Sequence, residues 1–444
     1  MSLIKISFKQ DALKKAGTDF KTEVIAGFTT FLAMAYILAV NPSILSGEAA
    51  NIPGFALMDK GAVFTATALS AAIATLVMGI FANLPFALAP GMGLNAFLTY
   101  TVCLTMGKSW QFALTAIFCE GILFLLLTFF NVREAIVNSI PQNLKKAIGV
   151  GIGLFIAFIG LQNAGIIVDG ATLVSLNITS PSAIVALIGV VITAVLVAHN
   201  VKGGILLGIL ATTIVGIPFG VTQFSGVASL PPSIAPTFMK FNFAEVAANI
   251  PDFIIVMFTF LFVDMFDTVG TLIGCAGKAD MIREDGTIPN CKEALFADAV
   301  GTTVGAMLGT STVTTFVESS TGVVEGGRTG VTAIVTAFFF LLSLFFAPLF
   351  LSIPSAATAP ALILVGFFMM SPVKDIDFSD PTEGIPAFLC LLMMVCAYSI
   401  SDGIMFGILS YVIIKVLAGK AKKISVATYI VALLFVIKII VNVI

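Results

Sequence analysis

Long apolar stretches recur along almost the whole chain, with short polar intervals between them. A helix that crosses a bilayer needs about 20 mostly apolar residues, and fourteen stretches reach or approach that length. They run over 22–43, 61–82, 86–106, 110–130, 145–166, 182–199, 202–219, 252–274, 293–309, 310–324, 329–351, 355–371, 384–400 and 402–418. This pattern predicts an all-α polytopic membrane protein, which a polar interval at 220–251 divides into seven spans and seven.

A further apolar stretch at 424–443 contains Lys438 and has two interpretations. It is either another span or a helix along the inner membrane surface, and we favour the surface helix. The composition agrees with lipid as the solvent, because 59% of residues are hydrophobic and 10% are charged, against about 25% charged residues in soluble domains. No run of Lys or Arg suggests a nucleic-acid partner.

The basic residues fall mainly on one side of the predicted membrane. Residues 1–21 carry five Lys and no signal-peptide pattern, so we expect a cytosolic N-terminus. With alternating spans, Lys60, Lys108 and Lys240 fall outside, and eighteen of the 22 Lys and Arg fall inside. Besides the N-terminal five, these are Arg133, Lys145, Lys146, Lys202, Lys278, Arg283, Lys292, Arg328, Lys374, Lys415, Lys420, Lys422 and Lys423. The bias follows the positive-inside rule for a cytoplasmic membrane.

The second set of spans resembles the first. The matching segments are Ser139-Ile140-Pro141 with Ser352-Ile353-Pro354, Gly153 and Phe155 with Gly366 and Phe368, and Thr30-Phe31-Leu32 with Thr259-Phe260-Leu261. Because seven is odd, the second repeat (252–418) must be inserted upside down relative to the first (22–219). Inverted repeats are typical of transporters, which bind their substrate near the bilayer midplane between the repeats.

The third span of each repeat is interrupted. Pro90, Gly91 and Gly93 disfavour an unbroken helix in the first repeat, and the short stretch 309–322 is rich in hydroxyl groups and contains Glu318. Interrupted spans at corresponding positions indicate a transporter's site, and we expect each to enter as extended chain and continue as a half-helix. The alternative, that Gly and Pro only allow close helix packing, leaves Glu318 unexplained.

Four carboxyl groups lie within spans of the second repeat. Asp264 and Asp267 fall in its first span, Asp298 in its second and Glu318 in its third, with no Lys or Arg in these spans. A charge at the bilayer centre costs at least about 2.5–3.5 kcal/mol, so such acids are functional candidates. They can take up protons and accept hydrogen bonds from ring N–H groups, and binding Na⁺ is the competing use. Thr271 shares a helix face with Asp267.

Other polar residues leave alternatives open. Asp298 could instead make a structural hydrogen bond to a hydroxyl such as that of Thr310 or Thr314. Asn41-Pro42 is expected to end the first span. His199 is the single His, and the six Cys form no CxxC pair, so we predict no cofactor and no metal site.

Four motifs carry a family resemblance. They are LAPGMGLNAF (88–97), DMFDTVGTLIG (264–274), GTSTVTTFVESSTGV (309–323) and GGRTG (326–330). They closely resemble the AzgA-like adenine/guanine/hypoxanthine permeases of the nucleobase–cation symporter 2 family, and the resemblance covers essentially the whole chain. It implies the uracil-permease-like fold, with short strands in the third and tenth spans. It also implies a core domain (22–130 plus 252–351) that slides against a gate domain (145–219 plus 355–418), and a homodimer.

The resemblance further implies residue roles. Asp267 resembles the acid that hydrogen-bonds the base, and Asp298 the ninth-span acid tied to coupling. The contacts expected from the tenth and third spans are Glu318, Ser319, Ser320 and Asn95. To these we add Thr271, and Asp267 and Glu318 are also proton-coupling candidates.

The predicted function is therefore import of a purine nucleobase (adenine, guanine or hypoxanthine) by proton symport across a bacterial cytoplasmic membrane. An anion transporter or channel of the same fold is the alternative, although Asp267 and Glu318 would repel an anion. An enzyme is disfavoured, because the sequence has no HExxH, no GxSxG and no cluster of His.

Overall fold

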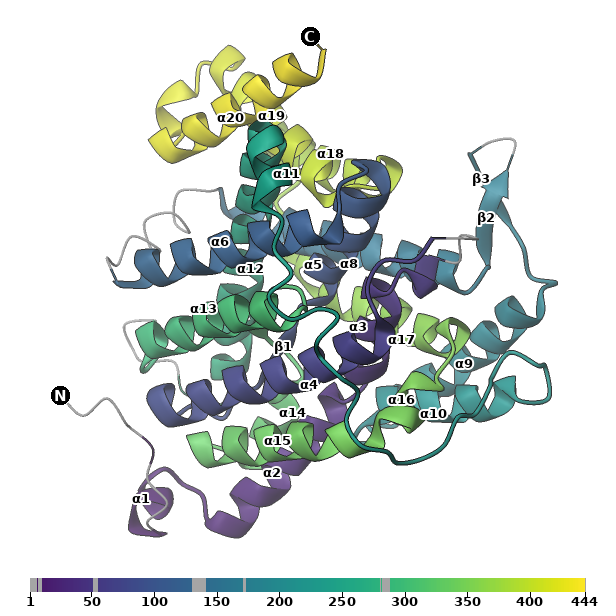
Figure 1. Ribbon diagram of the computed structural model, residues 1–444. Helices are drawn as coiled ribbons and strands as arrows, with labels where there is room; N and C mark the ends of the chain where they lie inside the picture. Colours follow the sequence, from purple (N-terminus) through teal and green to yellow (C-terminus); the bar gives the residue numbers. More distant parts are fainter. Residues whose placement is uncertain are drawn as a thin grey trace.

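The structure is a computed structural model that describes residues 6, 10–50, 55–129, 141–170, 173–279, 281 and 288–443. Its first half contains α1 (Gln10–Lys15), α2 (Phe20–Met34), α3 (Ile37–Leu45), α4 (Lys60–Val77), β1 (Leu88–Pro90), α5 (Met92–Ala96), α6 (Trp110–Phe129), α8 (Gln142–Asn163), β2 (Ile167–Gly170), β3 (Leu173–Leu176), α9 (Pro181–Ala198) and α10 (Gly204–Gly216). Its second half contains α11 (Phe243–Ala248), α12 (Ile250–Lys278), α13 (Cys291–Leu308), β4 (Val313–Thr315), α14 (Ser319–Val324), α15 (Gly330–Ser343), α16 (Ala347–Leu351), α17 (Ser355–Met369), α18 (Pro381–Cys396), α19 (Ile400–Leu417) and α20 (Val426–Val443). The chain is thus predominantly helical (Figure 1).

Most of the apolar stretches found in the sequence are helical. Within the described ranges, nine helical stretches are long and apolar enough to cross a bilayer, the first being Phe20–Leu45. Three shorter apolar helices, Met92–Thr105, Gly204–Gly216 and Pro381–Cys396, coincide with three further predicted spans. Residues Ser139, Ile140, Arg133 and Arg283, on which part of the repeat and charge predictions rest, lie outside the described residues.

Polar residues at helix starts explain several boundaries. The Asp59 carboxylate accepts a hydrogen bond from the Ala62 N–H at 2.7 Å and caps α4. Ser180 caps α9 in the same way at 3.2 Å, and Pro181 follows at the first helical position. A helix N-terminus leaves its first N–H groups without helical partners, so such side chains fix where the helix begins.

One predicted boundary is wrong. Asn41-Pro42 does not end the first span, because α3 continues through Pro42 to Leu45. Asn41 is buried, and its side-chain N–H groups donate to the hydroxyls of Thr67 at 2.7 Å and Thr310 at 2.9 Å. The interruption lies earlier, between α2 and α3, next to Tyr36.

Helices from the two halves of the chain alternate in space. Figure 1 shows α6, α13, α4 and α15 stacked in one layer. Helix α13 packs against both α6 and α4, and α15 packs against both α4 and α2. Elsewhere, α17 packs against α8, α9 and α10, and α18 packs against α8 and α19. Neither half therefore forms a separate body.

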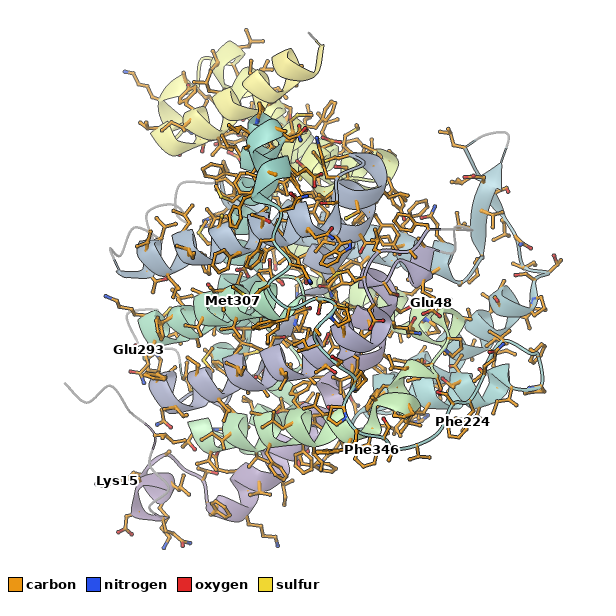
Figure 2. The ribbon with its side chains drawn as sticks, in the orientation of Figure 1. Lys15, Glu48, Phe224, Glu293, Met307 and Phe346 are labelled. Carbon is orange, nitrogen blue, oxygen red and sulfur yellow. The ribbon has the colours of Figure 1, made fainter. Side chains whose placement is uncertain are left out.

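The polar interval between the two sets of spans follows the ends of second-half helices. The Met239 N–H donates to the carbonyl oxygen of Met307 at 2.8 Å, and the Ser229 N–H donates to that of Phe345 at 3.0 Å. Figure 2 labels Met307 and also Phe346, the residue after Phe345, at two separate places along this path. It also shows side chains filling the spaces between the helices. The sequence analysis did not foresee the β2–β3 hairpin (Ile167–Gly170 with Leu173–Leu176).

The two interrupted spans meet as paired strands. Strand β1 pairs antiparallel with β4, with Ala89 opposite Thr314. The pairing continues on both sides, because the Gly91 N–H donates to the Thr312 carbonyl at 2.9 Å and the Phe316 N–H donates to that of Ala87 at 3.0 Å. A half-helix follows each strand, α5 after β1 and α14 after β4. The prediction of extended chain followed by a half-helix is confirmed.

Buried hydroxyls hydrogen-bond to backbone groups at the outer edges of this two-stranded ribbon. The Thr75 hydroxyl on α4 accepts from the Leu88 N–H at 2.9 Å and bonds the Leu88 carbonyl at 3.1 Å. On the other edge, the Thr302 hydroxyl on α13 makes the same pair of contacts with Val313, at 3.3 and 3.2 Å. An unpaired backbone group in this setting would cost several kcal/mol.

Glycines allow α8 and α17 to touch at their backbones. A Cβ atom added to Gly153 would lie 2.6 Å from the Cβ of Met369 and 2.9 Å from the carbonyl oxygen of Gly366. One helical turn earlier, a Cβ atom on Gly149 would have no neighbour within 4 Å. The two glycines lie in the same helix, so they differ in the atoms that pack against them.

We predict that Gly153→Ala destabilises the protein by about 1–3 kcal/mol, the usual cost of overpacking. Gly149→Ala is the matched control, and it should be neutral or stabilising by up to about 1 kcal/mol, because Ala favours a helix over Gly. The melting temperatures of both variants in one detergent measure the difference. A Gly153→Ala protein at least as stable as Gly149→Ala would contradict the packing.

Candidate functional site

The candidate site lies where the paired strands give way to half-helices. Asn95 stands on α5, and Glu318 immediately precedes α14. Asp267 belongs to α12, which packs against both α14 and β4. The structure therefore brings together residues that the sequence places in three different spans.

Hydroxyl groups bond to the two central carboxyl groups of the site, those of Asp267 and Glu318. The Thr314 hydroxyl on β4 donates to Asp267 Oδ2 at 3.2 Å. The Tyr36 hydroxyl donates to Glu318 Oε1 at 2.7 Å, although the two residues are 282 positions apart. Both acids are half-buried, whereas the Tyr36 side chain is buried. Sequence reasoning missed Tyr36, which lies in the break between α2 and α3, a break that the sequence analysis did not predict.

Asn95 has an unused donor. Its side-chain oxygen accepts a hydrogen bond from the Ser311 hydroxyl. Its side-chain nitrogen is buried and has no hydrogen-bond partner among the described residues. A buried donor without a partner costs about 1–3 kcal/mol, so Asn95 fits the role of a contact for an acceptor atom on a ligand.

The other predicted contact residues divide into two kinds. Ser319 is committed to the fold, because its hydroxyl accepts from the Ala87 N–H at 3.0 Å, at the start of the strand pair. Ser320 is buried, and its N–H donates to the Val317 carbonyl at 3.0 Å. Thr271 is half-buried one turn after Asp267 on α12. Among these three, Thr271 is the residue whose side chain the structure places on the Asp267 face.

Asp298 lies one layer behind the central carboxyl groups. It is buried on α13, and the Thr268 hydroxyl on α12 donates to its Oδ1 at 2.7 Å. The same hydroxyl lies 3.4 Å from Asp264 Oδ1, and the Thr302 hydroxyl lies 3.5 Å from Asp264 Oδ2. A structural hydrogen bond was foreseen as the alternative role of Asp298, but with Thr310 or Thr314 as the partner, and Thr268 is the partner found.

The arrangement can bind a small neutral molecule that carries N–H donors. Carboxylates are acceptors only, and the hydroxyls of Tyr36 and Thr314 leave lone pairs of both acids available. Within the part of the chain that the structure describes, no group of three or more His, Cys, Asp or Glu side chains could hold a metal ion.

Comparison with known proteins places the chain in a family. The sequence profile of a family described as the permease family matches residues 21–440. The chain belongs to this family. The predicted resemblance is confirmed, and the chain is a multi-pass membrane transporter rather than an enzyme.

Curated relatives extend over nearly the whole chain. The adenine permease AdeP of Escherichia coli strain K12 is 44% identical, over 96% of this chain and 94% of its own length. The guanine/hypoxanthine permease PbuG of Bacillus subtilis strain 168 is also 44% identical, over 96% of this chain and 97% of its own. The solved transmembrane domain of the cyanobacterial bicarbonate transporter BicA has the same fold, with a TM-score of 0.67 at 15% identity, over 92% of this chain and 100% of that domain.

We predict that Thr268→Val destabilises the permease by about 1.5–3 kcal/mol, because a buried carboxyl group loses its donor. Thr268→Ser keeps the hydroxyl and should recover most of this loss. Thr193→Val is the control, since the buried Thr193 hydroxyl donates to its own helix at the Gly189 carbonyl (2.7 Å). Thermal unfolding of the three purified proteins measures the differences. Equal losses for Thr268→Val and Thr193→Val would contradict the network.

Proposed function

We propose that this permease imports purine nucleobases, namely adenine, guanine or hypoxanthine, by proton symport. The observation that carries the proposal is the pair of hydroxyl-held carboxyl groups beside the paired strands, Asp267 on α12, which bonds to Thr314 of β4, and Glu318, which precedes α14. A purine presents ring and exocyclic N–H donors that such carboxylates accept, and Asn95 supplies a donor for a ring nitrogen or carbonyl oxygen. The names of the curated relatives support the substrate class.

The same acids argue against the alternative of an anion transporter. A permanent anion close to Asp267 and Glu318 would be repelled unless both were protonated. The likeness to a bicarbonate transporter concerns the fold alone, because only 15% of aligned residues are identical. We therefore assign Asp267, Glu318, Asn95 and Thr271 to direct contact with the base, with Ser319 and Ser320 supporting Glu318.

We also propose that the chain forms fourteen spans in two inverted repeats, 22–219 and 252–418. Under a twofold axis in the membrane plane, equivalent residues touch each other only on the axis. Two separate pairs support such an axis. Gly153 and Gly366 match in sequence and are in contact, and the third span pairs with the tenth through Ala89 and Thr314. The hydroxyls of Thr75 and Thr302 also play equivalent roles at the two edges.

We propose the division into core (22–130 plus 252–351) and gate (145–219 plus 355–418), and the helix packing supports it. The alternating layer of α6, α13, α4 and α15 belongs to the proposed core, and the α8, α17, α18 and α19 cluster belongs to the proposed gate. All the proposed substrate contacts lie in the core. Transport would then move the loaded core against the gate, in a homodimer within the bacterial inner membrane.

Proton coupling is assigned to Asp267, Glu318 and Asp298. Protonation of Asp298 would change its bond to the Thr268 hydroxyl on α12, which also lies 3.4 Å from Asp264. Asp264 in turn lies 3.5 Å from the Thr302 hydroxyl, which donates to Val313 of β4. Because the Thr314 hydroxyl on β4 also bonds to Asp267, a proton on Asp298 can alter the position of Asp267. The N-terminus is proposed to be cytosolic, with α20 (within 424–443) on the inner surface.

We predict that the permease takes up at least one of radiolabelled adenine, guanine and hypoxanthine, and takes up no labelled bicarbonate. Asp267→Asn and Glu318→Ala should each lower uptake about 10- to 100-fold, the effect of losing a hydrogen bond to a charged group. Asp169→Asn, which removes the same charge from the exposed hairpin, should leave uptake unchanged.

Bicarbonate uptake without purine uptake would overturn the proposed substrate. Normal purine uptake by correctly inserted Asp267→Asn would overturn the assignment of that residue. Detergent-solubilised protein of each variant should elute as a single folded species, which separates loss of binding from loss of fold.

We predict that a protonophore abolishes concentrative uptake and that replacing Na⁺ by choline does not. Uptake should also be faster at acidic than at alkaline external pH, because the proton enters with the base. Uptake by proteoliposomes with an imposed pH gradient checks both. Uptake that requires Na⁺ and ignores the pH gradient would show that Na⁺, the competing ion, is the coupling ion.

A further inference from the structure

A cavity of about 290 Å³ lies beyond the candidate site along the same interrupted span. It is lined by the π-helical stretch Phe97–Thr105 that continues α5, by the first turns of α12 and by the start of α19. Ligand sites begin at about 300 Å³ and favour boundaries between domains. This cavity has the size for one small molecule and lies between the proposed core and gate.

The polar lining offers both hydroxyl groups and carboxylates. Thr105 lines the cavity as an exposed residue, and its hydroxyl donates to the Tyr100 carbonyl at 2.9 Å. Asp252 lines it from α12 and is paired with Lys108 at 2.7 Å, which neutralises one charge. Asp402 lines it from the first turn of α19. These groups suit a neutral molecule that carries N–H donors and would repel an anion.

Partly exposed apolar side chains line the cavity beside the helical run that carries Asn95. Met106 lines it at the end of this run, and Phe97, whose side chain is buried, borders it two residues after Asn95. The Phe97 ring meets the ring of Phe260 edge to face, with centroids 4.9 Å apart. Ile255 adds an aliphatic wall. A flat ring system can lie against such walls while its edge reaches the hydroxyls and carboxylates.

The charge distribution indicates on which side of the membrane the cavity lies. Lys108, which is paired with Asp252, is one of three basic residues on the outer side of the proposed topology. The cavity therefore faces the side from which an imported base arrives. The Thr259 hydroxyl on α12 lies 3.4 Å from that of Ser401 on α19, so a core span and a gate span meet beside the cavity.

We propose that this cavity is a second, outer binding site for the nucleobase, occupied before the base reaches Asp267 and Glu318. The inference rests on the proposed function and adds a site to it. Asp402 accepts hydrogen bonds from the edge of the base, and Ile255 and Met106 contact its face. The outer site raises the local concentration of the base next to the broken span.

The test is equilibrium binding of a labelled base to purified permease in nanodiscs. The probe is whichever of adenine, guanine or hypoxanthine the wild type transports, or adenine if it transports none. The wild type should bind two molecules per chain, and the double variant Asp267→Asn, Glu318→Gln should keep one. Adding Thr105→Trp, an exposed residue at the cavity, should weaken this remaining site about tenfold or more.

Leu104→Trp is the matched control, because Leu104 is the exposed neighbour of Thr105 and does not line the cavity. Asp402→Asn gives an independent weakening without added bulk. A double variant that binds no base would overturn the outer site, as would equal binding after Thr105→Trp and Leu104→Trp. Failure of wild-type uptake would instead overturn the proposed function, while the binding result still decides the outer site.

In transport, the outer site predicts a separation of kinetic parameters. Thr105→Trp in the otherwise native chain should raise KM several-fold and leave the maximal rate within about twofold, because the inner site is intact. Loss of maximal rate with unchanged KM would overturn the role as a site occupied on the way in.

Discussion

The structure depends on one constraint, namely that no backbone N–H or carbonyl can remain unpaired away from water. Two spans stop being helical in the middle of the protein, which frees several such groups. The β1–β4 pairing satisfies the inner edges, and Thr75 and Thr302 satisfy the outer edges at Leu88 and Val313. Because a two-stranded ribbon is closed in this way, two half-helices can begin deep in the fold and place Asn95 and Glu318 there.

The same constraint explains a buried acid that is not in the site. Glu23 on α2 accepts hydrogen bonds from the N–H groups of Arg328, Thr329 and Thr332, at 2.9, 3.1 and 2.9 Å. These donors lie just before α15 and in its first turn, where the N-terminal dipole of the helix favours a negative charge. Glu23 therefore caps a helix of the other half of the chain. An acid within a span becomes a substrate contact only where its acceptor capacity is not consumed by the backbone.

The sequence predicted the features that residues close together in the chain determine. Apolar runs set the helices to within a few residues, and Pro90, Gly91 and Gly93 marked the interrupted third span. Features that depend on distant partners were missed or mistaken. Tyr36 and Glu318 are 282 positions apart, and no spacing pattern connects them. Asn41-Pro42 resembled a helix end, because the sequence does not show that Thr67 and Thr310 receive the Asn41 donors inside the protein.

The choice of donors around the two central acids has a chemical consequence. An Arg or Lys partner would stabilise each carboxylate strongly and keep it charged. Tyr36 and Thr314 donate hydrogen bonds without adding positive charge, so Asp267 and Glu318 retain both affinity for a proton and free lone pairs. Two such acids near each other also repel when both are charged. In the proposed symport, a neutral ligand with N–H donors and a proton would relieve the same repulsion, which would link their binding without any direct contact between them.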